Sequence, residues 1–289
     1  MSWTFYLIIF IALVVVISIV VYFFQEQFLF HPEKLPQDFQ FQYQNQKVKE
    51  YNLEIKKGVN INGLLFKSKG KPKGLVYYLK GNSKSIKGWG KFAVDFTLHN
   101  YNVLMIDYRG FGKSTGKKSQ QAMKDDALLV YDKIKEVVKE EDIIVYGRSL
   151  GTGLATKVAS MNNPKMLILA CPYFSMRKNV KRYLPFIPLG LVMRYSMPTY
   201  KWIKYVKCPI KIIHGTDDKV IKFKSSLRLA KMKPKQSRLY PIIDGGHKNL
   251  HNFESYHTAL EEILNSEGKS EIDREHTSID FVRTKQKKK

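Results

Sequence analysis

Cysteine and acidic side chains are scarce in this 289-residue sequence, and both shortages narrow its chemistry. Its two cysteines, Cys171 and Cys208, lack C-x-x-C spacing and a nearby histidine cluster, so we expect neither a disulfide framework nor a metal site. Aspartate and glutamate number 25 against 49 lysines and arginines, which gives a formal net charge of +24. So basic a chain indicates an anionic partner, and the classes to weigh are nucleic acid, anionic lipid and acidic substrates.

Charged side chains are absent from Trp3 to Phe24, an apolar stretch long enough to cross a bilayer as a helix. A cleaved signal peptide is disfavoured, because no lysine or arginine precedes the stretch and bulky rings stand where small cleavage-site residues belong. A buried core helix is the alternative. We predict an uncleaved, single-pass anchor over residues 1–25.

Composition divides the remaining chain into three parts. Residues 26–50 are rich in Gln, Phe and Pro without a clear period, and we expect a connector laid on the domain surface. Regular patterns begin at residue 51 and predict one domain over residues 51–268. The tail, residues 269–289, ends in KQKKK and is charged enough to be disordered.

Hydrophobic patterning predicts the fold class of this domain. Two alternating segments, YNLEI and INGLLF, are joined by turn residues and predict a hairpin. Five continuous apolar runs follow, as expected of strands covered on both faces: LVYYL, NVLMI, IIVYG, MLILA and IKIIHG. Helical periodicity separates them, most clearly from Ala127 to Val138. We predict an α/β fold, a mostly parallel central sheet with helices on both faces, opened by an antiparallel hairpin.

The stretch DYRGFGKSTG, residues 107–116, has the look of a phosphate-binding loop. Its GKS is the end of a P-loop, and its spaced glycines begin a dinucleotide fingerprint. A P-loop, however, needs glycine where Asp107 stands, and the third glycine of the dinucleotide pattern falls on Thr115. Both nucleotide readings fail, so we expect no cofactor and interpret the stretch as a loop that supports the site.

A candidate nucleophile lies in GRSLGTG, which follows the strand-like IIVY and precedes a helix-like segment. Gly147, Ser149 and Gly151 form G-x-S-x-G in the strand, turn and helix context that this motif requires. The elbow would expose the Ser149 hydroxyl and direct the Leu150 N–H at an oxyanion. The alternative is a chance match on a surface turn.

The acid is found by elimination, because a serine nucleophile needs a base and the base needs a carboxylate. No Asp or Glu occurs from residue 143 to residue 216, and only Asp217, Asp218 and Asp244 precede the late histidines. Asp218 lies just beyond the strand IKIIHG, whereas Asp244 is too close to the base on one loop. We predict Asp218 as the acid.

Two further groups complete the candidate site. His247 follows a short apolar run and the pair Gly245–Gly246, at the end of a last strand, and we prefer it to His251 as the base. A second oxyanion donor should come from the loop after the first parallel strand, where Gly81 permits close approach and the Asn82 N–H can point inward.

The ordered set KGNS, DYRGFGKSTG, GRSLGTG, HGTDDKV and GGH resembles the α/β-hydrolase superfamily over about residues 51–264. It is similar to membrane-anchored hydrolases grouped as serine aminopeptidase-like, which include monoglyceride-lipase-like enzymes. The resemblance implies an α/β-hydrolase fold and assigns five residues: nucleophile Ser149, acid Asp218, base His247, and oxyanion N–H donors Asn82 and Leu150.

One position departs from the family pattern. The family usually has His-Gly-Asn where this chain has Lys80 before Gly81 and Asn82. The backbone donor survives this change, but the electrostatics of the site are altered. A catalytically silent hydrolase fold that serves as a binding module therefore stays open beside an active enzyme.

The segment of about residues 172–207 occupies the place of a cap and contains no carboxylate. It carries many lysines and arginines around the apolar LPFIPLGLVM, a pattern that suits a lid lying against an anionic membrane. A solvated basic face over ordinary lid packing is the alternative. A cap without acids also argues against an aminopeptidase, which should offer carboxylates to a free ammonium group.

We therefore predict a membrane-anchored serine hydrolase of acyl esters or thioesters, acting on a lipid or an acylated protein. A serine peptidase on the same triad is the alternative enzyme. Nucleic acid binding is suggested only by the net charge. Because no binding motif occurs, we expect no nucleic acid partner. The positive-inside rule slightly favours a cytoplasmic domain. No lysine or arginine precedes the anchor, whereas basic residues follow it from Lys34 onward. The sequence leaves the oligomeric state open.

Overall fold

An eight-stranded sheet with the order β1-β2-β4-β3-β5-β6-β7-β8 forms the centre of the protein in the computed structural model, which describes residues 2–266. The strands are β1 (Lys47–Lys56), β2 (Val59–Lys67), β3 (Gly74–Leu79), β4 (Tyr101–Ile106), β5 (Ile143–Arg148), β6 (Met166–Ala170), β7 (Ile210–Gly215) and β8 (Ser237–Ile242). β1 and β2 form an antiparallel hairpin, and β2 pairs antiparallel with β4. All other neighbours pair in parallel, so the predicted fold class is confirmed.

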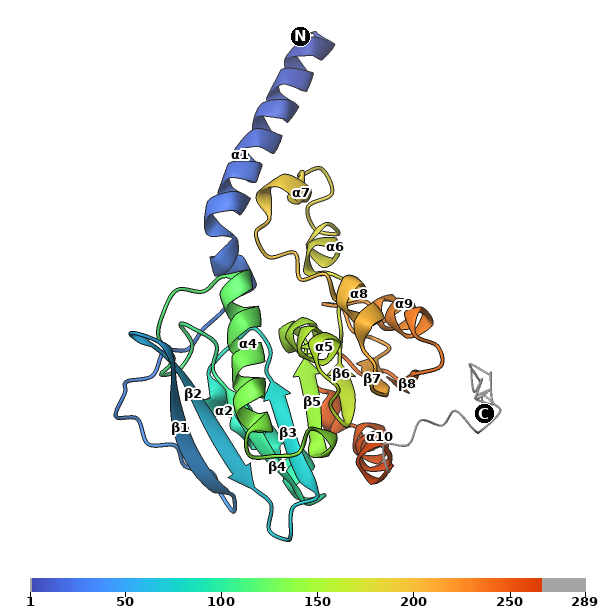
Figure 1. Cartoon of the computed structure of the whole chain (residues 1–289). Coiled ribbons are helices and arrows are strands. Elements are labelled where there is room, and N and C mark those ends of the chain that lie inside the picture. The colour runs from blue at the N-terminus through green and yellow to red at the C-terminus, as the bar shows by residue number, and fades with distance from the viewer. Residues whose placement is uncertain (1, 267–289) are drawn as a thin grey trace, which may run out of the picture.

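Helices cover both faces of this sheet, as Figure 1 shows. One face packs against α4 (Gln120–Lys135), α5 (Leu150–Met161) and α9 (Lys224–Met232). The other packs against α2 (Ile86–Trp89), α3 (Val94–Thr97) and α10 (Glu254–Asn265). Short 3-10 turns complete these layers: η1 (Gly90–Ala93), η2 (Glu140–Asp142) and η4 (Leu250–Asn252).

The strand sequences explain this layering. Every residue of β5 is buried, and its alternate side chains join two separate apolar clusters, Ile143 and Val145 on one face and Ile144 and Tyr146 on the other. A strand covered on both faces needs such a continuous apolar run. Because parallel strands end at one edge of the sheet, the loops after β3, β5, β7 and β8 meet there.

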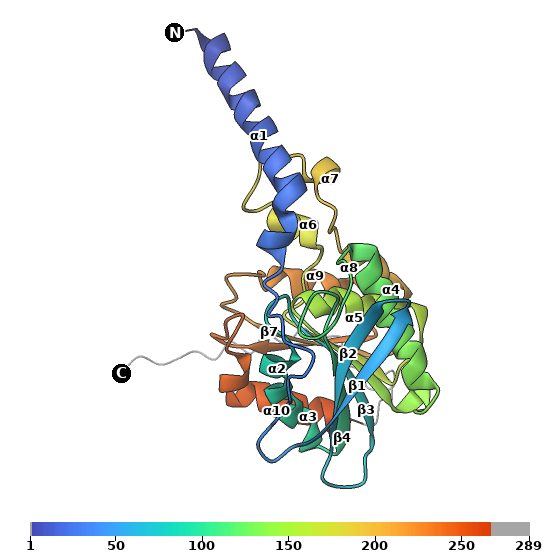
Figure 2. The same ribbon diagram turned by 90° about the vertical axis from the view of Figure 1, so that its left-hand side faces the viewer.

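A long helix, α1 (Trp3–Leu29), projects away from the domain (Figures 1 and 2). It is long and apolar enough to cross a membrane, with a mean hydropathy of 3.3 over its best 18-residue window. Only Val21 and Gln25 of this helix are buried in the protein. The helix continues four residues beyond the predicted boundary at residue 25, and the segment after it is hydrogen-bonded to the domain through His31 and Leu35. The predicted basic tail, residues 269–289, lies outside the described residues.

The cap lies between β6 and β7 and consists of short helices: α6 (Met176–Val180), α7 (Leu189–Val192), α8 (Thr199–Trp202) and η3 (Ile203–Tyr205). Both views show α6 and α7 beside the domain-proximal half of α1 (Figures 1 and 2). The rings of Phe10 in α1 and Phe186 in the cap have centroids 5.6 Å apart in an edge-to-face contact. The cap therefore reaches well along the apolar helix.

Candidate active site

Ser149 occupies a strained turn between β5 and α5. Its backbone angles are φ 52° and ψ −116°, a conformation that non-glycine residues rarely adopt. The turn is possible because its flanking glycines leave room. A Cβ on Gly147 would lie 2.6 Å from the Gly151 carbonyl oxygen, and one on Gly151 would lie 1.9 Å from the Leu79 carbonyl oxygen. The G-x-S-x-G sequence thus forms the strand–turn–helix elbow that was expected of it.

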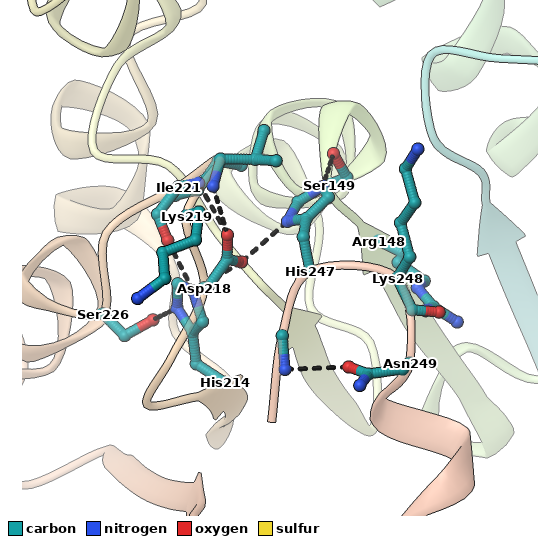
Figure 3. Close-up of polar contacts among 12 residues, drawn as sticks. Arg148, Ser149, His214, Asp218, Lys219, Ile221, Ser226, His247, Lys248 and Asn249 are labelled. Atoms are coloured by element: carbon teal, nitrogen blue, oxygen red, sulfur yellow. Dashed lines mark hydrogen bonds and ion pairs between the residues drawn. The ribbon is translucent and has the colours of Figure 1, made fainter. Parts of the chain in front are cut away.

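Three predicted residues lie in one hydrogen-bonded chain, shown in Figure 3. Ser149 Oγ is 2.9 Å from His247 Nε2, and His247 Nδ1 is 2.7 Å from Asp218 Oδ2. Because Nδ1 faces a carboxylate, it carries the proton of the neutral ring, and Nε2 is left to accept a proton from the Ser149 hydroxyl. The arrangement is suited to activating the hydroxyl as a nucleophile.

Asp218 is held by hydrogen bonds at both carboxylate oxygens. The backbone N–H groups of Val220 and Ile221 each donate to Oδ1 at 2.8 Å, while His214 and His247 lie against Oδ2. Burial by itself would raise the pKa of this carboxyl. The hydrogen bonds outweigh that effect and hold the pKa of Asp218 well below its usual range, so the carboxylate is ionised throughout the neutral range.

His214 is a member of this site that the sequence analysis did not identify. Its Nε2 lies 3.1 Å from Asp218 Oδ2 and 2.9 Å from the Ile221 carbonyl oxygen, both acceptors, so Nε2 carries the proton. Its Nδ1 then accepts from Ser226 Oγ at 2.6 Å. Both side chains are fully buried, so they fix the position of Asp218 from behind. His214 lies at the end of β7, but a strand-end histidine alone did not indicate this partner.

Cys171, His214 and Asp218 form the one group of potential metal ligands found among residues 2–266, with ligand atoms within 4.8 Å of one another. Their chemistry does not fit a metal site. Burial raises the pKa of the Cys171 thiol, so it stays protonated, and His214 and Asp218 already use their facing atoms in hydrogen bonds. A deprotonated thiolate would be needed to bind a metal.

The loop Lys80–Ile86, which we call the oxyanion loop, follows β3 and passes beside the nucleophile. A Cβ on Gly81 would lie 2.8 Å from the Trp89 ring and 3.7 Å from the Ser149 Cβ, so glycine permits the close approach. Among the described residues, the Asn82 backbone N–H has no hydrogen-bond acceptor. Leu150 is the first residue of α5, where N–H groups lack partners within the helix. Gly81, the neighbour of Asn82, thus lies close to Ser149, and Leu150 follows Ser149 directly in the chain.

Lys80 is the first residue of the oxyanion loop, and its side chain is fully buried among groups other than the three residues of the triad. Its Nζ is 3.3 Å from Asp107 Oδ1, donates to the Lys84 carbonyl oxygen at 3.1 Å, and lies 3.9 Å from the centroid of the Phe111 ring. Burial lowers the pKa of Lys80 to about 8, against the opposing effect of Asp107. Burial also raises the pKa of Asp107 to about 6, so both groups are charged near neutral pH.

The stretch that resembled a nucleotide loop supports this pair. Gly112 has φ 50°, and a Cβ there would lie 2.0 Å from Asp107 Oδ2, so glycine lets the loop close over the carboxylate. Asp107 also accepts from the Ile86 N–H at 3.0 Å. Arg109 forms a two-pronged ion pair with Asp126 of α4, at 2.8 and 2.6 Å. These contacts agree with a bracing role for the loop.

The rejected candidates lie elsewhere. Asp217 pairs with Lys219, and Asp244 is exposed. The centroid of the His251 ring lies 5.0 Å from that of the Phe92 ring. His251 is not part of the hydrogen-bonded chain of Ser149, His247 and Asp218.

Comparisons with known proteins agree with the fold. A family model described as Serine aminopeptidase, S33, matches residues 70–204. Two curated relatives are named lysophosphatidylserine lipase ABHD12. The Danio rerio protein is 29% identical over 180 residues, covering 54% of this chain and 46% of the relative. The Rattus norvegicus protein is 29% identical over 237 residues, covering 70% and 58%. The chain thus spans about half the length of the curated relatives it matches.

Solved esterases share the architecture. The Pyrococcus furiosus esterase Pf2001 superposes with a TM-score of 0.64 at 18% identity, covering 82% of this chain and 97% of that one. Est1E from Butyrivibrio proteoclasticus, with ferulic acid bound, gives a TM-score of 0.61 at 19% identity and covers 74% and 97%. At these identities the likeness establishes the fold.

Proposed function

We propose that the protein is a membrane-anchored serine hydrolase of the α/β-hydrolase superfamily that cleaves acyl esters through Ser149, His247 and Asp218. The observation that carries the proposal is the unbroken chain from Ser149 Oγ through the His247 ring to Asp218, at 2.9 and 2.7 Å. Binding modules need no such hydrogen-bonded chain, and a strained backbone such as that of Ser149 is typical of active sites, where the surrounding structure enforces it.

The reaction follows from the positions of these groups. Ser149 Oγ attacks the acyl carbonyl carbon while its proton passes to His247 Nε2. The carbonyl oxygen becomes an oxyanion between the N–H groups of Asn82 and Leu150. When the ester C–O bond breaks, the alcohol leaves with the proton from His247, and the acyl group stays on Ser149. Water then attacks the acyl-enzyme by the same route, which releases the acid and restores the serine hydroxyl.

Lipid is the substrate class that the rest of the molecule supports. The cap side chains Phe186 and Leu191 are 71% and 85% exposed. Phe186 contacts Phe10 of α1, and Leu191 belongs to α7, which lies beside the same apolar helix. Large exposed apolar side chains at such a place favour contact with acyl chains over water. The relatives named lysophosphatidylserine lipase are consistent with an acyl ester presented by a membrane.

Basic side chains border this apolar part of the cap. A hollow of about 250 Å³ lies between α6 and α9. Five basic side chains line it: Lys178 and Arg182 on one side, and Lys222, Lys224 and Arg228 on the other. None of the five has an acidic partner within 4 Å among the residues that the structure describes. At a bilayer surface each nearby cation would contribute about 1 kcal/mol of attraction to anionic lipid. We propose on this ground that the catalytic domain lies on the cytoplasmic side, and protease protection of sealed vesicles tests it.

Substrate preference can be tested directly with purified full-length protein. We expect hydrolysis of medium-chain acyl esters to exceed that of aminoacyl arylamides by orders of magnitude, because the described cap has no carboxylate to bind a free ammonium group. Acyl thioesters form the third arm of the panel. Preference for the arylamides would favour the peptidase instead, and Ser149→Ala supplies the background rate for every arm.

A further inference from the structure

The end of α1 is bonded directly to the oxyanion loop. The Asn82 side-chain amide donates to the Leu29 carbonyl oxygen at 2.8 Å. Two backbone hydrogen bonds then follow, from the His31 N–H to the Asn82 carbonyl oxygen at 3.0 Å and from the Lys84 N–H to the His31 carbonyl oxygen at 2.8 Å. The last residue of the helix and the segment after it thus lie alongside the residue that offers the oxyanion donor.

The segment Phe30–Leu35, which we call the strap, continues this contact. The Glu33 carboxylate accepts from Ser85 Oγ at 2.7 Å and from the Ser85 N–H at 3.3 Å. These bonds are the leading cause that lowers the pKa of Glu33. Phe30 is 3% exposed and packs edge-to-face on Tyr195 of the cap, with ring centroids 4.9 Å apart. The strap is therefore fixed to the oxyanion loop at two places and to the cap at a third.

The same turn of α1 is also tied to the cap. Gln25 is 2% exposed, accepts from the Arg194 N–H at 2.7 Å and donates to the Val192 carbonyl oxygen at 3.2 Å. Glu26 accepts from Tyr195 Oη at 2.8 Å. The end of α1 thus contacts both the cap and the oxyanion loop.

We propose that the end of the membrane helix and the strap are positioning elements of the active site: they hold the oxyanion loop in the geometry in which the Asn82 N–H faces the oxyanion. The inference rests on the proposed function. An oxyanion hole works because its donors are fixed before the reaction. The bond from the Asn82 side chain to Leu29 of α1 and the bond from the His31 N–H of the strap to the Asn82 carbonyl oxygen fix this residue, and they leave its backbone N–H unpaired among the described residues. The anchor is thus part of the catalytic framework as well as a tether.

The experiment compares full-length variants in detergent on a water-soluble short-chain ester, so that delivery from a membrane plays no part. Asn82→Ala keeps the backbone N–H but removes the donor to Leu29. Its matched control is Asn162→Ala, which removes an equivalent amide-to-carbonyl bond, to Val158 at 3.0 Å, far along α5 from the site. We expect kcat to fall roughly 10- to 100-fold for Asn82→Ala with KM nearly unchanged, because a displaced donor loses part of the 10²- to 10³-fold effect of such a group. The control should keep both constants.

Glu33 gives a second, graded test from the other side of the contact. Glu33→Ala removes both bonds to Ser85, whereas Glu33→Gln keeps one oxygen acceptor. We expect kcat to fall in the order wild type, Gln, Ala, again with little change in KM. Glu136→Gln, at an exposed ion pair with Lys133 on the far side of α4, is the matched control and should behave as wild type.

Amide hydrogen exchange gives a readout that needs no turnover. The backbone amides of residues 82–86 should exchange faster in Asn82→Ala and Glu33→Ala than in wild type, while β5 and β6 stay protected. If both variants keep kcat within twofold and leave exchange in the loop unchanged, the inference is wrong. If wild-type protein hydrolyses no ester but the loop still loosens, the proposed function fails and the structural coupling stands.

Discussion

The Asp218 carboxylate has more partners than a triad acid requires. It receives His247, His214 and two backbone N–H groups, and its pKa is held below the ordinary value of about 4. Asp218→Asn should lower kcat by roughly 10⁴-fold, because an amide can stabilise the wrong histidine tautomer. Steady-state kinetics on a soluble ester measure this effect. A loss below tenfold would argue against Asp218 as the acid.

The same group makes stability depend on pH with a definite sign. Below about pH 4 the unfolded chain takes up a proton at this carboxyl that the folded state does not. The stabilisation is therefore complete above about pH 4 and is lost as the pH falls toward the folded pKa. Urea unfolding should show the wild type's advantage over Asp218→Asn shrinking from about pH 5 to pH 3, and a growing advantage would contradict the assignment.

The buried pair Lys80–Asp107 gives a second prediction at this scale. Lys80→Met should destabilise the fold by about 3–5 kcal/mol, because it leaves the Asp107 carboxylate buried without its counter-charge. The double variant Lys80→Met, Asp107→Asn removes that charge and should recover part of the loss. Denaturant unfolding of the three proteins measures the coupling. Additive effects would show that the two residues do not act as a pair.

Single residues were predictable from sequence only where a local motif constrains them. Ser149 could be singled out as a candidate because its glycines and its strand–helix context are contiguous. The acid could be narrowed to Asp217, Asp218 and Asp244 because no Asp or Glu occurs from residue 143 to residue 216. His214 was missed as a partner of Asp218, and the role of Lys80 was not foreseen, because each acts through a contact between segments that sequence spacing does not define.

Among the elements, the strands were the most predictable. The apolar runs LVYYL, NVLMI, IIVYG, MLILA and IKIIHG coincide with β3 to β7 within about one residue, since strands buried on both faces must be continuously apolar. The connector was the least predictable. Its docking depends on single buried side chains such as Phe30 and on backbone bonds to the oxyanion loop, and neither produces a periodic pattern.

The contact between α1 and the cap supplies a prediction for these elements. Gln25→Leu fills the same buried place but leaves the Val192 carbonyl and the Arg194 N–H without their partner. An unsatisfied buried group costs about 1–3 kcal/mol, so the cap should open more often. Hydrogen exchange over residues 189–196 should accelerate while the central strands keep their protection. Unchanged exchange there would mean that Gln25 does not hold the cap.

For the whole molecule, the proposed function implies that the anchor, the apolar cap and the basic hollow face the membrane. Replacing the exposed cap side chains, in Phe186→Ser with Leu191→Ser, should raise the apparent KM for a bilayer-borne ester several-fold and leave kcat on a soluble ester unchanged. The apolar area removed no longer contributes to contact with acyl chains. If the variant kept the wild-type KM for the bilayer-borne ester, the cap would take no part in lipid delivery.

The central claim is that Ser149 is a nucleophile activated by His247. Labelling of folded, full-length protein with a fluorophosphonate probe tests it most directly, because the probe reacts with an activated serine in one step. We predict rapid labelling of the wild type, none of Ser149→Ala, and strongly slowed labelling of His247→Ala. Undiminished labelling of Ser149→Ala, or no labelling of the folded wild type, would contradict the account.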